Sequence, residues 1–376
     1  MSIAPLATLL VIPTGIGCAV GGYAGDGLPA ARLLAAASGC LITHPNALNG
    51  ASLYWSDRRI HYVEGWALDR FAAGELALVP VSGRRVGLLL DAAIEPELRQ
   101  RQIQAAEACR ATLGIAIGPV VCSDQPLGVG LSLGPSGSSW GSLQNPEALL
   151  RAAERLVAAG ASAIAVVARF PDDPASGALA AYRHGSGVDA LAGAEAVISH
   201  LLVERFGIPC AHAPALAPLP LDPDLDPRTA AEELGHTFLP CVLVGLSRAP
   251  DLRPLHAGLF MPCASQAGRD VSQGPCLGGT GAITAAQLGA VVAPAGALGG
   301  EAVLACAERG VPVIAVEGNP SVLQVDGAAL GLQVIKAATY AEAAGLVLAL
   351  REGIDPASLR RPLARLELLA ALDPPL

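Results

Sequence analysis

The stretch that decides the fold lies near the start of the chain and reads ATLLVIPTGIGCAVGG over residues 7–22. Its first six residues form an uninterrupted run, almost all of it apolar, which is typical of a strand buried on both faces of a parallel sheet. The glycines after Pro13 indicate a tight turn. Residues 29–37 then show the pattern of a helix with proline in its first turn. The sequence therefore predicts a strand, a glycine-rich turn and a helix, in that order.

The same alternation of short apolar runs and helical stretches continues along the chain. It predicts an α/β fold with largely parallel, doubly wound, Rossmann-like sheets. Further strands are predicted at residues 40–43, 86–90, 120–123, 163–169, 208–211, 241–246, 291–293, 313–316 and 334–337. Further helices are predicted at residues 97–113, 145–159, 191–206, 301–309 and 341–351.

The length of 376 residues favours more than one structural unit. We predict an N-terminal α/β lobe over residues 1–143 and a C-terminal α/β lobe over residues 144–376, with a proline-rich connection at 216–227. A stretch rich in glycine and serine at 124–144 is interpreted as the loop that separates the lobes.

Composition excludes several classes of protein. Apolar residues make up 52% and charged residues only 15%, which excludes an intrinsically disordered chain. The net charge is −9 and there is no basic stripe, so no nucleic-acid partner is expected. Lys336 is the single lysine, and the chain has no Gly-Lys-Ser/Thr phosphate-binding loop. An anion held by a cationic side chain would therefore be held mainly by arginine.

The nine cysteines show no C-x-x-C spacing, which fits free thiols in a reducing cytosol better than a disulfide framework. The first 25 residues are uncharged, but Pro13 and several glycines interrupt them, so no membrane-spanning helix is expected there. We predict a cytoplasmic protein without a membrane partner.

In an open α/β sheet, ligands bind beyond the carboxyl ends of the strands. The polar or glycine residues that follow each predicted strand are therefore the candidates for a binding site. Those with a predicted ligand-binding role are Thr14, Gly15, Gly17, Asn46, Arg169, Arg248 and Asn319. Those with a predicted catalytic role are His44, His212, Asp91 and Asp172.

Each type of candidate has a chemical reason. Imidazole titrates near neutral pH, so His44 or His212 would move a proton, and Asp91 or Asp172 would orient it. Arginine binds carboxylate or phosphate through two parallel hydrogen bonds. The glycine turns at residues 14–22 and 294–300 would supply backbone amide donors.

Cofactor and metal assignments stay open. The glycines after the first strand partly match a dinucleotide-binding fingerprint, but their spacing is irregular, and His44 stands where that motif has an acidic residue. The cofactor is therefore left unknown. Cys210 and His212 share one face of a strand, yet no paired metal motif supports them, and no metal site is predicted.

Several segments resemble a single family. They are VIPTGIG (11–17), GGYAGD (21–26), LITHPN (41–46), YVEGWALD (62–69), VVARFPDD (166–173) and PCAHAPA (209–215). The chain is identified by these segments as a member of the family called domain of unknown function 3326, which occurs in cyanobacteria, plant plastids and some archaea. The resemblance implies a soluble, cytoplasmic bacterial protein of a photosynthetic organism, and it brings no established activity or catalytic residues.

Two functions are compatible with these observations. The first is an enzyme that acts on a small anionic metabolite, a carboxylate or phosphate, by acid/base chemistry at the carboxyl edge of the sheet. The alternative is a non-catalytic binding or assembly protein of the photosynthetic cytosol, whose apolar runs would serve interfaces between subunits or partners. Either could form a homo-oligomer.

Overall fold

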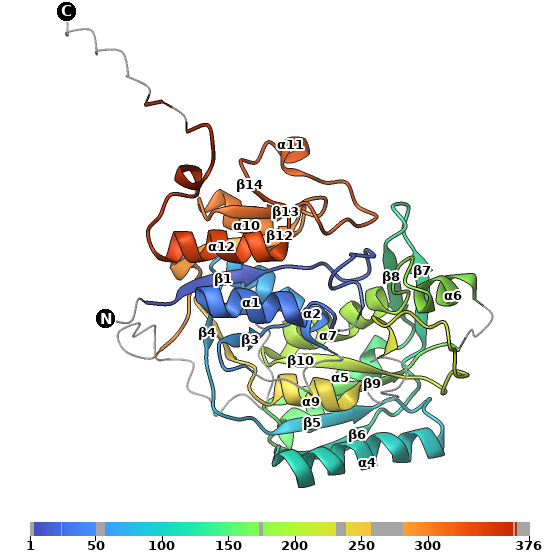
Figure 1. Cartoon of the computed structure of the whole chain (residues 1–376). Coiled ribbons are helices and arrows are strands. Elements are labelled where there is room, and N and C mark those ends of the chain that lie inside the picture. The colour runs from blue at the N-terminus through green and yellow to red at the C-terminus, as the bar shows by residue number, and fades with distance from the viewer. Residues whose placement is uncertain are drawn as a thin grey trace, which may run out of the picture.

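The computed structural model describes residues 4–23, 25–49, 57–172, 176–230, 238–256, 281–363 and 365–366. Two parallel sheets flanked by helices form the body of the molecule, which confirms the predicted α/β class. In Figure 1 the blue N-terminal elements and the orange and red C-terminal elements lie together, and the cyan to green middle of the chain lies below them.

The larger sheet has six strands, and all of its neighbouring strands run parallel. Their order across the sheet is β14 (Ile335–Ala337), β13 (Val313–Val316), β12 (Leu288–Pro294), β1 (Leu6–Leu10), β2 (Gly39–Thr43) and β3 (Ile60–Tyr62). The chain moves outward in one direction from β1 and in the other direction from β12. This is the doubly wound order, with the switch point between β1 and β12.

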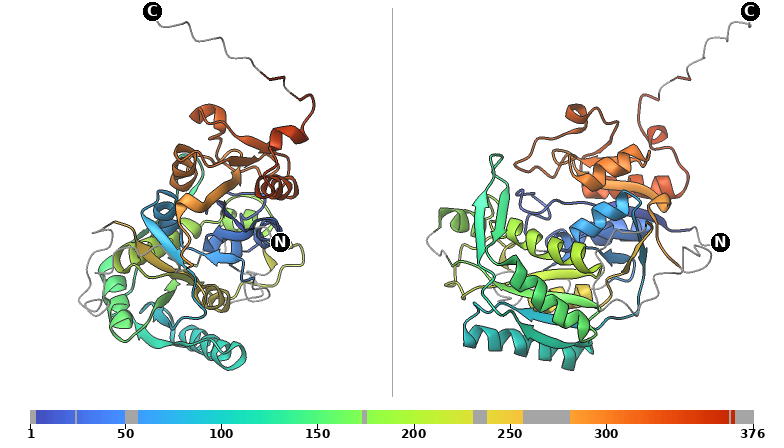
Figure 2. Two further views of the ribbon diagram at one scale, coloured as in Figure 1. Left: turned by 90° about the vertical axis from the view of Figure 1, so that its left-hand side faces the viewer. Right: turned by 180° about the vertical axis from the view of Figure 1, so that it is seen from behind.

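The smaller sheet is built from the middle of the chain. It has four parallel strands in the order β10 (Cys210–Ala215), β9 (Ala163–Arg169), β5 (Val86–Leu90) and β6 (Ile117–Cys122). All four strands of this sheet lie in the part of the sequence between β3 and β12, which are the third and fourth strands of the larger sheet in chain order. Figure 2 shows the two sheets from the side and from behind.

Helices cover both sheets, and the strands alternate between two apolar cores. Leu9 and Val11 pack in one core and Leu10 and Ile12 in the other, because successive side chains of a strand point to opposite faces. The first core holds α3 (Gly65–Ala72), α5 (Pro146–Ala158), α7 (Ala192–Phe206) and α10 (Glu301–Glu308). The second holds α1 (Leu28–Ser38), α4 (Pro96–Leu113), α9 (Leu239–Leu246) and α12 (Tyr340–Arg351). Each core contains residues of both sheets, so the sheets are packed together.

Shorter elements complete the structure. A two-stranded pair joins β4 (Leu76–Val79) to β11 (Asp251–Pro254), and a hairpin joins β7 (Val129–Leu133) to β8 (Ser139–Leu143). The short helices are α2 (Pro45–Leu48), α6 (Gly177–Arg183) and α11 (Gly327–Leu330), with 3₁₀ turns at Ala285–Gln287 and Pro356–Leu359.

Two predicted elements are wrong. Residues 241–246, predicted as a strand, belong to helix α9, because a short apolar run does not distinguish a buried strand from a buried helix. Pro240 lies in the first turn of that helix, where proline is tolerated. The loop predicted at 124–144 contains the β7–β8 hairpin, whose alternating pattern is masked by glycine and serine.

Sheet membership does not follow the predicted lobe boundary at 143/144. Strands β5 and β6 precede that position and pair in one sheet with β9 and β10, which follow it. The boundary itself stays a prediction, because sheet membership is not a division into domains.

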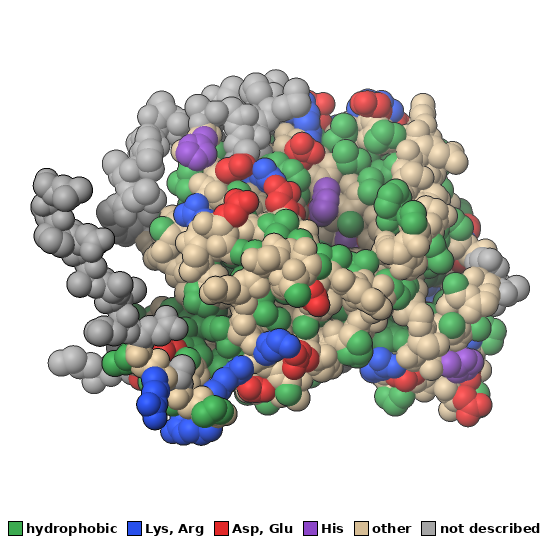
Figure 3. Space-filling view, turned by 90° about the horizontal axis from the view of Figure 1, so that it is seen from above, with side chains coloured by type: hydrophobic (Ala, Val, Ile, Leu, Met, Phe, Trp, Pro, Cys, Tyr) green, Lys and Arg blue, Asp and Glu red, His purple; other side chains and the backbone are tan. Residues whose placement is uncertain are grey.

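Among the described residues, no helix is both long and apolar enough to cross a membrane. On the face that Figure 3 shows, acidic and basic side chains lie next to one another in several small groups, and apolar side chains lie between these groups.

Candidate functional site

A cavity of about 480 Å³ lies where the carboxyl ends of the two sheets meet. Thr14, His44 and Glu64 follow strands β1, β2 and β3 of the larger sheet, and Asp172 follows β9 of the smaller one. His212 reaches the cavity from β10 itself. Most of the remaining wall is apolar, and it includes Leu131, Leu179, Leu191, Leu216, Leu219 and Phe238. A mostly apolar hollow with a few converging polar groups is the usual form of a small-molecule site.

His44 is held in one tautomer. It is 7% exposed, and its Nε2 accepts a hydrogen bond from the backbone N–H of Ile12 at 3.0 Å. Burial, together with the nearby His200, lowers the pKa of His44 to about 4. The ring is therefore neutral at pH 7, and because Nε2 is an acceptor, the ring proton is on Nδ1. His44 is a hydrogen-bond donor at this site rather than a base.

Asn49 provides a second donor beside His44. It is 8% exposed and lines the cavity just after α2. The Tyr62 hydroxyl donates to its Oδ1 at 2.9 Å, which fixes the orientation of the amide and leaves Nδ2 as the cavity-facing group. Asn46 also lines the cavity, but its Nδ2 donates to the carbonyl of Gly21 at 2.9 Å.

The opposite wall carries a carboxylate–histidine pair. Nε2 of His212 lies 3.3 Å from a carboxyl oxygen of Glu195, and its Nδ1 lies 3.2 Å from the Ser199 hydroxyl. Glu195 and Ser199 are four residues apart on α7 and so share one helix face. The serine hydroxyl also donates to the carbonyl of Glu195 at 3.1 Å. This arrangement holds the imidazole between two polar partners, as a proton-transfer group requires.

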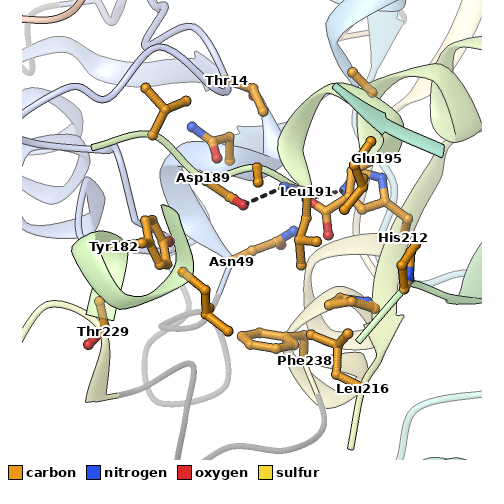
Figure 4. A pocket seen from close by; sticks show the side chains of 18 of the residues that line it. Thr14, Asn49, Tyr182, Asp189, Leu191, Glu195, His212, Leu216, Thr229 and Phe238 are labelled. Carbon is orange, nitrogen blue, oxygen red and sulfur yellow. Dashed lines mark hydrogen bonds and ion pairs between the residues drawn. The ribbon is translucent and has the colours of Figure 1, made fainter. Parts of the chain in front are cut away.

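Asp189 lies at the start of the same wall, before α7. The backbone N–H of Leu191 donates to its Oδ1 at 2.9 Å (Figure 4). Burial raises the pKa of Asp189 to about 7, and the nearby carboxylate of Glu195 adds to the rise. Asp189 is therefore a carboxyl group that can exchange a proton near neutral pH, a property that is common at functional sites.

A further ion pair closes the side of the cavity between the sheets. Nε2 of His200, on α7, lies 3.0 Å from the carboxylate of Glu64, which also caps α3 by accepting from the N–H of Trp66 at 2.9 Å. Interaction with the carboxylates of Glu64 and Asp69 raises the pKa of His200 against the opposing effect of burial. The pair links a helix over the larger sheet to a helix of the smaller one.

Acidic side chains outnumber arginines in the wall. Four lining residues are acidic, namely Glu64, Asp172, Asp189 and Glu195, and one is an arginine, Arg183. Glu64 is paired with His200 and Asp172 with Arg169. The Arg183 guanidinium donates to the carbonyl of Pro220 at 2.8 Å and faces Asp222 at 3.8 Å. At the mouth, Tyr182 of α6 stacks on Tyr23 with ring centres 4.5 Å apart.

Two of the predicted residues lie in a separate, closed cluster. Asp91 is fully buried and accepts hydrogen bonds from the backbone N–H groups of Ala93, Leu127 and Arg169 at 3.0–3.1 Å. The Arg169 side chain binds the carboxylates of Glu95 and Asp172. Neither Asp91 nor Arg169 lines the cavity.

The predicted glycine turn is also closed by the chain's own groups. The N–H of Gly21 donates to Asp26 at 2.6 Å, and the N–H of Val20 donates to Asn319 at 2.8 Å. Burial raises the pKa of Asp26 to about 6. The turn therefore already binds a carboxyl group from its own loop, at one of the backbone N–H groups that were predicted to bind an anionic ligand.

Gly15 and Gly17 are packed closely against neighbouring segments. Both have positive φ, and a side chain at Gly15 would lie 2.7 Å from Cβ of Ser139 on the hairpin. Neither glycine lines the cavity, nor do Asn319, which is buried against Tyr340, and Arg248, which is exposed after α9. The structure thus gathers five of the predicted residues, which are Thr14, His44, Asn46, Asp172 and His212.

The predicted catalytic and ligand-binding residues did not include Asn49, Glu64, Asp189, Glu195, Ser199 or His200, all of which line the cavity. A signal for two of them was present, because Glu195 and Ser199 are four residues apart and share one face of a largely apolar helix. Asp189 and Asn49 lie in loops, where no periodicity marks the direction of a side chain. Among the described residues, no cluster of three or more histidine, cysteine or acidic side chains has the geometry to hold a metal ion.

Comparison with known proteins places the chain among relatives without an established activity. The family model described as "Protein of unknown function (DUF3326)" matches residues 7–360. An "Uncharacterized lipoprotein" of Synechococcus sp. (strain PCC 6301) is 54% identical over 356 residues, which cover 94% of this chain and 93% of that protein. No solved structure matches the chain.

Proposed function

This chain belongs to the DUF3326 family of proteins of unknown function, and from that premise we propose that it binds a small molecule in the cavity between its sheets and transfers a proton at it. The ligand is mostly apolar and is uncharged or cationic. Asp189 and the Glu195–His212 pair are the groups that exchange the proton.

The observation that carries this proposal is the juxtaposition of titratable groups on one wall of a largely apolar cavity. Figure 4 shows Asp189, Glu195 and His212 around the same hollow, with Leu216 and Phe238 at its other end. An apolar surrounding strengthens the electrostatic effect of each group and brings carboxyl pKa values toward neutrality. Such groups suit acid/base chemistry more than simple retention of a ligand.

The partners of the arginines around the cavity argue against the anionic metabolite predicted from the sequence. The guanidinium of Arg169, which was predicted to bind the anion, is instead bound by Glu95 and Asp172. Arg183, the arginine that lines the cavity, already binds the carbonyl of Pro220 and faces Asp222. A carboxylate or phosphate would therefore enter a poorly solvated space that contains acidic side chains and, among the described residues, no arginine placed to receive it. An uncharged or cationic molecule avoids this cost.

We also propose the cytoplasm as the place where the protein acts. The cysteines in the described part of the chain are free, as thiols are in a reducing compartment. The name of the Synechococcus relative favours membrane attachment instead. Cell fractionation combined with palmitate labelling tests this proposal, and label on the protein in the membrane fraction would overturn it.

The test of function uses three ligands with one skeleton: cyclohexylmethylamine, cyclohexylmethanol and cyclohexanecarboxylate. The amine and the alcohol should raise the melting temperature with rising concentration, and the carboxylate should not. Glu195→Gln should reduce the effect of the amine, whereas Glu308→Gln, at an exposed position on α10, should leave it unchanged.

Stabilisation by the carboxylate alone would contradict the proposal. Absence of any stabilisation, together with a stably co-purifying protein partner, would favour the non-catalytic binding or assembly protein.

A further inference from the structure

The cavity has a second polar wall that the proton-transfer groups do not use. It is formed by His44, at the end of β2, and by Asn49, just after α2. Both side chains are more than nine-tenths buried, so neither is a solvated surface group. Within the described residues, Nδ1 of His44 and Nδ2 of Asn49 have no hydrogen-bond partner. Neither nitrogen is among the fully buried unpaired atoms of the described residues, so both are accessible from the cavity that the two side chains line.

Each donor is fixed by a contact on its far side. The N–H of Ile12 occupies Nε2 of His44, and the Tyr62 hydroxyl occupies Oδ1 of Asn49. Neither side chain can therefore turn to present an acceptor to the ligand without breaking a buried hydrogen bond. The groups that His44 and Asn49 present to the cavity are both hydrogen-bond donors. Neither is charged, because His44 is neutral at pH 7.

We propose that His44 and Asn49 bind the oxygen atom of a carbonyl group, and that the ligand of this site is a small apolar aldehyde, ketone or similar carbonyl compound. This inference rests on the proposed function, whose proton-transfer groups line the same cavity. A carbonyl oxygen accepts two hydrogen bonds through its two lone pairs, which matches the two donors.

The positions of the two walls fit this assignment. Glu195 and His200 are five residues apart on α7, a rise of about 7.5 Å at 1.5 Å per residue. His44 lies beside His200 at one end of that span, close enough for their charges to interact, and the Glu195–His212 pair lies at the other. Figure 4 shows Asn49 and Glu195 extending into the same hollow from different elements. A carbonyl oxygen bound by His44 and Asn49 would therefore place the adjacent carbon on the side of the cavity toward Glu195.

The chemistry that follows is removal of a proton from the carbon next to the carbonyl group. The C–H bond breaks and its proton passes to the carboxylate of Glu195. The electron pair of that bond forms a C=C bond, and the π pair of the carbonyl group moves onto its oxygen as an enolate. The two donors stabilise that oxygen, and a neutral imidazole suits this role. Return of the proton to the same carbon gives exchange with solvent, and return to another carbon gives isomerisation.

The experiment uses cyclohexanone as the probe, with the full-length protein in D₂O. We expect the protein to accelerate deuterium incorporation next to the carbonyl group, followed by NMR, and to lower the infrared stretching frequency of the bound carbonyl group. Asn49→Asp keeps the acceptor for Tyr62 and removes the amide donor, so exchange should fall about 10²-fold and the frequency shift should shrink. Asn49→Leu is the second variant without the donor.

Glu195→Gln separates this inference from the proposed function. It should abolish exchange and leave the carbonyl frequency shift in place, because the donors are untouched. Glu308→Gln should behave as the unaltered protein in both measurements. If cyclohexylmethanol stabilised the protein but bound cyclohexanone showed no carbonyl frequency shift, binding of a carbonyl oxygen by His44 and Asn49 would be contradicted. The proposed function would not be affected by that result. Failure of all probes to bind would overturn both.

Discussion

Asp91 follows strand β5, and Asp189 precedes helix α7. The surroundings of these two aspartates differ completely. Asp91 is fully enclosed and accepts three backbone hydrogen bonds from three separate segments. Asp189 lines the cavity, accepts from the N–H of Leu191, and has a raised pKa. The two carboxylates differ in what they connect: Asp91 joins its own loop to the segments at Leu127 and Arg169, whereas the donor to Asp189 comes from the adjacent start of α7.

The comparison shows two uses of polar residues at the carboxyl edge of parallel strands. Loops that leave neighbouring strands must be joined to one another, and a carboxylate that accepts several N–H groups does this directly. Polar groups that remain only partly satisfied by the chain face the cavity instead. A position after a strand is therefore compatible with either use, and the segments that the group connects distinguish them.

The largest expected effect comes from removing the enclosed carboxylate. Asp91→Ala leaves three buried N–H groups without an acceptor, at about 1–3 kcal/mol each, so the free energy of unfolding should fall by at least about 3 kcal/mol. Urea unfolding followed by circular dichroism measures this. Asp124→Ala is the matched control, because Asp124 is exposed and pairs with Arg151 at the surface. If the two variants had the same free energy of unfolding, the proposed structural role of Asp91 would be contradicted.

A smaller effect of opposite sign is expected at the cavity. The raised pKa means that native Asp189 holds its proton up to about pH 7, whereas the unfolded chain releases it near pH 4. The contribution of Asp189 to stability is therefore greatest at low pH and is lost as pH rises through 7. Asp189→Asn should match the unaltered protein at pH 4 and exceed its stability by up to about 4 kcal/mol at pH 8, because a difference of about three pKa units corresponds to about 1.4 kcal/mol per unit. Thermal unfolding across that range tests this, and a difference independent of pH would contradict it.

The smallest effect is expected at a polar residue that neither joins loops nor faces the cavity. Arg248 is exposed after α9 and does not line the cavity. Arg248→Ala should change the free energy of unfolding by less than about 0.5 kcal/mol and leave stabilisation by cyclohexylmethylamine unaltered. A loss of that stabilisation would place Arg248 at the site and weaken the distinction drawn between the two aspartates.

The sequence predicted the sheets better than the site. Strands 86–90, 163–169 and 313–316 were predicted with the bounds that the structure gives them, because strands buried on both faces are continuous apolar runs. Helix α9 was predicted as a strand because its apolar run is equally continuous. For the site, the predicted edge contributed His44 and His212, but the direction of a loop side chain such as Asp189 depends on contacts between distant segments.

By itself, the sequence determined the α/β class, the largely parallel direction of the strands and the expectation of polar groups at their carboxyl ends, since these follow from local apolar patterns and from the covalent direction of the chain. The tertiary structure alone decided which polar groups are enclosed and which face a cavity. That choice depends on the meeting of two sheets formed by opposite ends and the middle of the chain. Burial and hydrogen-bond partners are properties of that packing, and no local pattern contains them.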